Sequence, residues 1–131
     1  MTMTPLEVVN SFYEALSLGH APAAIALLDD EVKWTEAETA PYYSGTWIGP
    51  KAVYKNLFEP LSREWSSFAV VPESSVVEGS VVVTFGTYAG TYKVTSKSMA
   101  AGFAHRWEVA GGKITSFQQY TDTASMNEVL S

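Results

Sequence analysis

Cysteine is absent from this 131-residue sequence, and histidine occurs only twice, at His20 and His105. The chain therefore has no disulfide, no thiolate metal ligand and no cysteine nucleophile. Two histidines so far apart in sequence are too few for an ordinary zinc site. We expect a protein that works without a metal ion.

Basic residues are also scarce, with 8 Lys and Arg against 14 Asp and Glu, and a net charge of −6. The basic residues are scattered, which argues against nucleic acid and anionic membrane as partners. No run of about 18 consecutive apolar residues occurs, and the N-terminus lacks the basic and apolar stretches of a secretion signal. We interpret the protein as cytoplasmic.

The length predicts one domain over residues 1–131, because the chain is too short for two ordinary hydrophobic cores. Apolar residues make up 47% of the sequence and aromatic residues 13%, which excludes disorder. So many aromatic side chains fit either a lined cavity or ordinary core packing.

Three helices are predicted in the first half. Thr4-Pro5-Leu6-Glu7 has the pattern of a capped helix start, and an apolar stripe that includes Val9 and Tyr13 follows at helical spacing. A second, shorter helix begins at Pro22 and runs to Leu28. The third begins at Gly49-Pro50, and Pro60 is expected to kink or break it.

Strand patterns follow these helices. We predict one strand at 32–36, between the second and third helices, and a meander of strands at 68–77, 81–94, 98–109 and 114–121. Gly86, Gly90 and Gly102 would permit bends in a coiled sheet. The fold class is α+β, with a curved antiparallel sheet wrapped around three helices as a cone-shaped barrel.

The order of these elements resembles the SnoaL-like polyketide cyclases of the nuclear-transport-factor-2-like superfamily, which has a cystatin-like fold and includes the ketosteroid isomerases. The segments Ala104-His105-Arg106-Trp107-Glu108-Val109, Gly112-Lys113-Ile114 and Gln119-Tyr120-Thr121-Asp122-Thr123 carry the resemblance. The resemblance implies an apolar small-molecule ligand, no cofactor, and lyase or isomerase chemistry such as aldol cyclisation. It also implies Asp122 as general base and His105 as its partner.

The residues themselves agree only in part with that assignment. His105 and Trp107 share one strand face, and Gln118, Tyr120 and Asp122 share one on the next strand, but parity does not tell which face looks into the hollow. A buried carboxylate has a raised pKa and suits proton abstraction beside a carbonyl. Asp122 could equally cap a short final helical turn, and His105 could be a neutral core residue.

We predict that a further group of side chains contacts the substrate: Tyr13, Trp34, Tyr43, Trp107, Gln118 and Tyr120. The other aromatic residues are assigned to packing. We also predict a homodimer, because the outer sheet face, thought to carry Phe85 and Phe117, needs cover.

Several rival functions stay open. Compared with ketosteroid isomerases, the tyrosine of the oxyanion hole falls on Phe12, and the base falls near Glu36, which together with Glu38 fits a solvated loop better. The charged Arg and Asp pair of limonene-epoxide hydrolases is missing from 82–87. A dehydratase, a non-catalytic ligand carrier or sensor, and an interaction module complete the alternatives.

Overall fold

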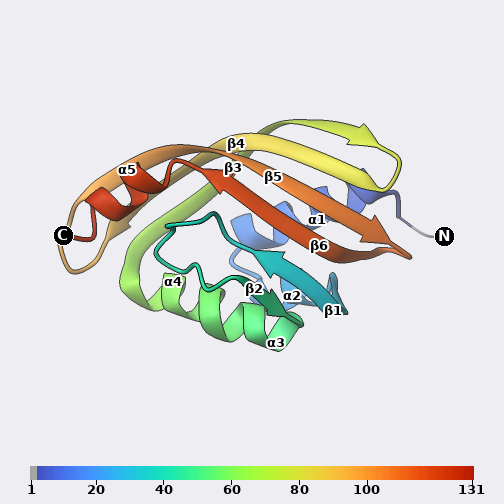
Figure 1. Ribbon diagram of the computed structural model, residues 1–131, viewed down its shortest axis with the longest axis horizontal. Coiled ribbons are helices and arrows are strands. Elements are labelled where there is room, and N and C mark those ends of the chain that lie inside the picture. Colours follow the sequence, from blue (N-terminus) through green and yellow to red (C-terminus); the bar gives the residue numbers. More distant parts are fainter. Residues whose placement is uncertain (1–2) are drawn as a thin grey trace.

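Six strands form one curved sheet in the computed structural model, which describes residues 3–131. The strands lie in the order β2-β1-β6-β5-β4-β3, and β2 and β3 are open edges. Their bounds are β1 (Leu28–Thr35), β2 (Thr46–Ile48), β3 (Trp65–Glu78), β4 (Val81–Tyr92), β5 (Ser98–Ala110) and β6 (Lys113–Thr121). Figure 1 shows strands β3 to β6 arching over the helices.

The expectation of a fully antiparallel sheet is wrong at one place, because β1 pairs with β6 in parallel. The strands β3 to β6 follow one another through short turns and are therefore antiparallel. Strand β1 is followed by β2 and three helical segments before the meander begins. No tight turn therefore fixes the direction of β1 relative to β6. The α+β class with a curved, helix-covered sheet is confirmed.

Helix α1 (Pro5–Ser17) begins as the sequence predicts. The Thr4 hydroxyl accepts a hydrogen bond from the Glu7 backbone, and the Glu7 carboxylate accepts one from the Thr4 N–H at 2.8 Å. The helix buries Val8, Phe12 and Tyr13 against the sheet. It therefore presents an aromatic face to the concave side.

The third predicted helix is continuous through three segments, α3 (Pro50–Val53), a π-helical turn η1 (Tyr54–Phe58) and α4 (Glu59–Glu64). Pro60 has no N–H to bond to residue 56, and the wider π turn just before it lets the helix continue. Leu57 and Phe58, adjacent residues of this π turn, both line the cavity described below.

The remaining helices are short. Helix α2 (Ala21–Ile25) follows α1, and α5 (Thr123–Glu128) follows β6 at the C-terminal end of the chain. In Figure 1, α5 lies at the end of the sheet near the C-terminus. None of the helices within residues 3–131 is long and apolar enough to cross a membrane.

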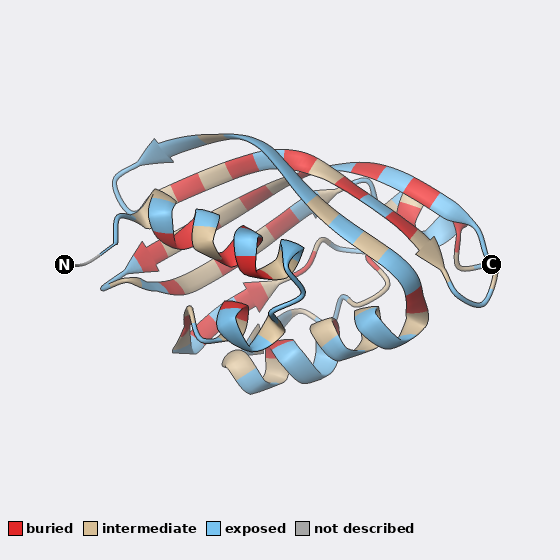
Figure 2. Cartoon of the chain, turned by 180° about the vertical axis from the view of Figure 1, so that it is seen from behind, coloured by how far each residue is buried: buried red, intermediate tan, exposed pale blue. Residues whose placement is uncertain are grey.

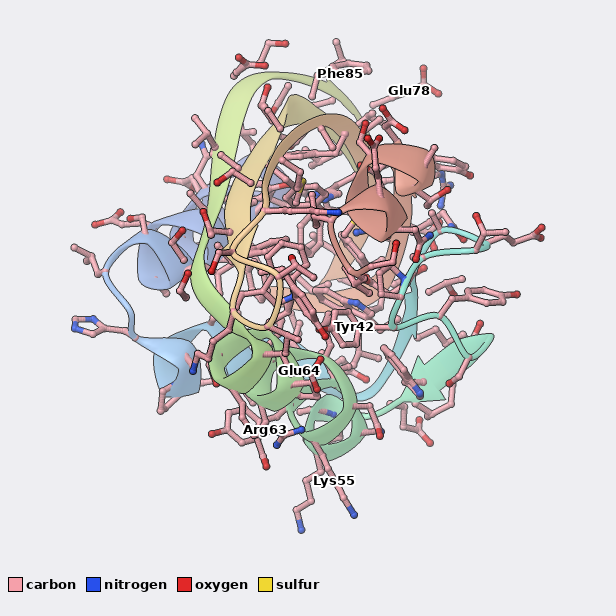
Figure 3. All side chains as sticks on the ribbon, turned by 90° about the vertical axis from the view of Figure 1, so that its left-hand side faces the viewer. Tyr42, Lys55, Arg63, Glu64, Glu78 and Phe85 are labelled. Carbon is pink, nitrogen blue, oxygen red and sulfur yellow. The ribbon has the colours of Figure 1, made fainter. Side chains whose placement is uncertain are left out.

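Burial alternates along the central strands, as Figure 2 shows for β4 and β5. In the β5–β6 register His105 lies opposite Gln119, and Trp107 lies opposite Phe117. Directly opposed residues share a sheet face, so all four side chains point to the concave side. Phe117 is therefore buried inside, contrary to the expected position on the outer face, whereas Phe85 is exposed outside (Figure 3).

Candidate active site

A cavity of about 600 Å³ lies between the concave face of the sheet and the helices. Aromatic side chains dominate its wall, and its polar groups come from a few residues. The ring-bearing residues that line it are Phe12, Tyr13, Trp34, Phe58, Trp65, Phe68, Tyr88, His105, Trp107 and Phe117. Such an apolar chamber with few converging polar groups is typical of a small-molecule site.

His105 is held between two tyrosine hydroxyls in this wall. Its Nδ1 lies 2.6 Å from the Tyr13 Oη, and its Nε2 forms a hydrogen bond with the Tyr88 Oη. The imidazole stacks on the Phe103 ring with centroids 3.9 Å apart. Burial lowers the pKa of His105 well below its ordinary value, so the ring is neutral and carries one N–H.

Each tyrosine oxygen also accepts a hydrogen bond from another side chain. The Trp107 Nε1 donates to the Tyr13 Oη at 3.1 Å, and the Gln119 Nε2 donates to the Tyr88 Oη at 2.9 Å. The orientation of the Gln119 amide is fixed, because its Oε1 accepts from the Ala37 N–H at 2.9 Å.

The hydrogen-bonded series Tyr13, His105 and Tyr88 has one hydroxyl proton that no bond within the series uses. Burial raises the pKa of both Tyr13 and Tyr88, so both hydroxyls keep their protons at neutral pH. A neutral imidazole donates to one tyrosine and accepts from the other. The hydroxyl proton of the tyrosine that accepts from His105 is then left for a further acceptor, such as a ligand oxygen.

Glu36 supplies the only carboxyl group of the cavity wall among the described residues. It follows β1, is 4% exposed, and accepts a hydrogen bond from the Trp34 Nε1 at 3.0 Å. Burial raises its pKa to about 7, although the Trp34 and Gln119 side chains act in the opposite direction. The group is thus poised to gain or lose a proton near neutral pH.

The aromatic loop before β2 packs against the end of α4. Tyr42 Oη donates to Glu64 Oε1 at 2.7 Å and accepts from the Trp65 Nε1 at 3.0 Å (Figure 3). This contact holds the loop beside Trp65, which lines the cavity. Tyr43 is 41% exposed and does not line the cavity, although the sequence predicts it as a ligand contact.

Of the other predicted site residues, the structure brings Tyr13, Trp34, His105 and Trp107 together around the cavity. Gln118 and Tyr120 lie on the opposite face of β6, and Tyr120 is 56% exposed. The reason is the register that places Gln119 opposite His105. The inward side chains of β6 are therefore Phe117 and Gln119.

Asp122 lies outside the cavity wall and caps helix α5. Its Oδ1 accepts from the Ser125 N–H at 3.0 Å, and its Oδ2 accepts from the Ser125 hydroxyl at 2.6 Å. These bonds with Ser125 hold its pKa below the ordinary value. The expected pairing of Asp122 with His105 is absent from the hydrogen bonds of residues 3–131.

Three buried residues that bring polar groups to the cavity are not among the predicted site residues: Glu36, Tyr88 and Gln119. For Glu36, the sequence does hold a signal, since the alternation Val32, Trp34, Glu36 continues a buried strand face. Tyr88 and Gln119 carry no comparable signal, because their positions depend on pairing between strands. Across residues 3–131, no group of three or more His, Cys, Asp or Glu side chains is placed to hold a metal ion.

Comparisons with known proteins agree with this architecture. The family of SnoaL-like domains matches residues 9–117. An NTF2-like protein from Burkholderia thailandensis has 31% sequence identity and a TM-score of 0.95, with 99% of each chain covered. No curated protein sequence matches the chain.

Two more distant structures share the fold. A protein with a ketosteroid isomerase-like fold from Catenulispora acidiphila, in complex with trimethylamine, is 19% identical with a TM-score of 0.80, covering 97% of this chain and 93% of its own. A proposed polyketide cyclase from Pseudomonas putida is 21% identical with a TM-score of 0.78, covering 97% and 98%. The family match extends over most of the chain, and this protein belongs to the SnoaL-like domain family.

Proposed function

We propose that the protein catalyses proton transfer at a carbon atom beside the carbonyl group of an apolar small molecule, as a polyketide cyclase or an isomerase does. The single observation that carries this proposal is the buried Glu36 carboxyl, which opens into the same cavity as the Tyr13 and Tyr88 hydroxyls. Membership of the SnoaL-like family supports the same reaction class.

Glu36 is the proposed base. Above pH 7 most of its carboxyl groups are ionised, since its pKa is about 7. A carboxylate in an apolar cavity is poorly hydrated and is therefore a stronger base toward a carbon acid than one in water. The Trp34 N–H donates to the Oε2 atom, and in this proposal the Oε1 atom takes the proton from the substrate.

A tyrosine hydroxyl is the proposed partner of the substrate oxygen. Removal of a proton beside a carbonyl places negative charge on that oxygen, and a preorganised donor stabilises it. The Tyr13, His105 and Tyr88 chain provides one free hydroxyl proton for this purpose. His105 thus keeps a proposed role at the site, but as a positioning residue that acts through tyrosine.

A second candidate is a non-catalytic protein that binds a small ligand in the same cavity. The ligand complex of the Catenulispora acidiphila relative supports small-molecule binding in this fold. Both candidates require the cavity, so ligand affinity alone does not separate them. Only the catalytic candidate converts its ligand, so a measurement of turnover separates the two.

The test is hydrogen exchange at carbon. The probe is 2-tetralone, an apolar bicyclic ketone with acidic protons next to its carbonyl group, in deuterated buffer at pH 8. Proton NMR should show deuterium entering those positions faster with the protein than in buffer alone. Binding of 2-tetralone without any faster exchange would favour the non-catalytic candidate.

We also propose that the protein is a cytoplasmic homodimer. The outer sheet face exposes Phe85 of β4 and Tyr120 of β6. Both residues pair with Ala104 of β5, so they lie on either side of it. A second copy could cover these side chains. Light scattering at micromolar concentration tests the dimer, and a monomeric mass over the whole range would contradict it.

A further inference from the structure

The cavity carries an unbalanced charge. Glu36 is its only carboxyl group, and no lysine or arginine lines it within the described part of the chain. The other titratable groups in the wall are Tyr13, Tyr88 and His105, which are neutral for the reasons given above. An ionised Glu36 therefore has no cationic partner in the cavity wall formed by residues 3–131.

Aromatic rings line the same cavity as this carboxyl, and one of them contacts it directly. Trp34, which donates to Glu36, lies with its ring centroid 5.9 Å from that of Phe12 and 6.0 Å from that of Phe58. Phe12 and Phe58 are themselves 6.2 Å apart, and all three rings line the cavity. The negative faces of aromatic rings attract cations, most strongly where water is excluded.

We infer that this cavity binds apolar monocations, namely tertiary or quaternary ammonium groups carried on a flat hydrocarbon, with the positive charge paired to the Glu36 carboxylate and lying against the Trp34, Phe12 and Phe58 rings. The same charge balance disfavours carboxylate, sulfate and phosphate ligands. This binding is independent of the proposed reaction, because it requires the carboxylate and the rings but no turnover.

Proton release is the most direct consequence. A cation that binds beside Glu36 favours the ionised carboxyl, so binding below pH 7 must expel a proton from part of the population. The affinity for a permanent cation should therefore rise about tenfold per pH unit below pH 7 and level off above it. A neutral ligand of the same shape has no such dependence.

The experiment uses isothermal titration calorimetry with (2-naphthylmethyl)trimethylammonium, whose charge does not titrate. Titrations at pH 6 in two buffers of different ionisation enthalpy give the number of protons released. We expect a release approaching one proton per bound cation. We also expect 2-naphthylacetate, an anion of similar size, to bind at least about tenfold more weakly than the cation.

Two variants form the matched comparison. Glu36→Gln keeps the shape of the side chain. It should abolish proton release and lower the affinity for the cation by about tenfold or more. Glu38→Gln removes the same charge from an exposed position two residues away and should change neither quantity. Retained binding of neutral 2-naphthylmethanol to Glu36→Gln shows that the cavity is still formed.

A third variant tests the rings. Phe58→Leu retains apolar volume but removes one aromatic face. The affinity for the cation should therefore fall by about threefold to thirtyfold, while the affinity for 2-naphthylmethanol should change little. Absence of proton release, or equal affinity of wild type and Glu36→Gln for the cation, would overturn the inference. Exchange of 2-tetralone is measured separately, so either proposal can fail while the other stands.

Discussion

The Nδ1 atom of His105 lies 2.6 Å from the Tyr13 hydroxyl, a contact in the cavity wall that joins helix α1 to strand β5. Trp107, two residues along the same strand face, donates to that hydroxyl as well. The Tyr13 oxygen is thus a shared partner of two buried groups. The bonds tie the first helix to the sheet at the cavity wall.

Tyr13→Phe should destabilise the protein by about 1–3 kcal/mol, because it leaves the buried Trp107 N–H and one imidazole nitrogen without their partner. Chemical denaturation measures the change. Tyr120→Phe is the matched control, since Tyr120 is 56% exposed and should tolerate the loss of its hydroxyl. Equal stability of the two variants would show that the buried bonds contribute nothing.

The pKa of Glu36 links stability to pH. Its folded-state pKa of about 7 exceeds its ordinary value of 4.5, so the folded protein holds the proton more tightly than the unfolded chain. The stabilisation is complete below pH 4.5 and is lost as pH rises to about 7, by an amount on the order of 3 kcal/mol.

Glu36→Gln should therefore be more stable than the wild type at pH 8 and close to it at pH 4.5, as measured by urea unfolding. Glu38→Gln, which changes an exposed carboxyl, should follow the wild type at both pH values. A wild-type advantage over Glu36→Gln at pH 8 would contradict the raised pKa.

Gly86 and Gly102 differ in what a side chain would meet. A Cβ atom at position 86 would lie 2.2 Å from the Val71 carbonyl oxygen and 2.5 Å from the Phe103 ring, whereas one at 102 meets nothing within 4 Å. Gly86→Ala should cost about 1–3 kcal/mol and shift the Phe103 ring that stacks on His105.

Gly102→Ala is the matched control for Gly86→Ala and should be nearly neutral in stability. Thermal unfolding of both variants makes the comparison. The two glycines were expected from the sequence to serve one purpose, permitting sheet bends. Similar melting temperatures for the two variants would contradict the close packing at Gly86.

Asp122→Asn should change neither 2-tetralone exchange nor stability appreciably, because asparagine caps a helix about as well as aspartate. Asp122→Ala should cost about 1 kcal/mol through loss of the cap. A fall in exchange of 10²-fold or more in Asp122→Asn, with unchanged stability, would restore Asp122 as the base.

The fold was predictable from the sequence because its signals are local. The cap at Thr4, the alternation along 81–94 and 98–109, and the glycine pair at 111–112 each fix an element or a turn without reference to distant residues. The parallel pairing of β1 with β6 and the short strand β2 depend on contacts between distant segments. No local pattern encodes them.

The site was less predictable for the same reason. Period-two alternation groups Gln118 with Tyr120 and, separately, Phe117 with Gln119, but only the pairing of β5 with β6 decides which group faces inward. The irregularity between Glu108 and Val109 shifts that register, so counting along the sequence does not give it. Glu36 is the opposite case. Its place in the alternating pattern of a buried strand indicates burial, but glutamate is usually exposed, and the sequence therefore favours a solvated loop.

The pH dependence of 2-tetralone exchange tests the central claim, that Glu36 is the base, most directly. The specificity constant kcat/KM, measured by NMR from pH 5 to 9, should rise with pH, reach half of its maximum near pH 7 and level off about one pH unit higher, where most of the carboxyl groups are ionised. Glu36→Gln should lower it by about 10²–10⁴-fold, and Glu38→Gln should leave it unchanged. Exchange that persists undiminished in Glu36→Gln, with the same pH profile as the wild type, would contradict the assignment of Glu36.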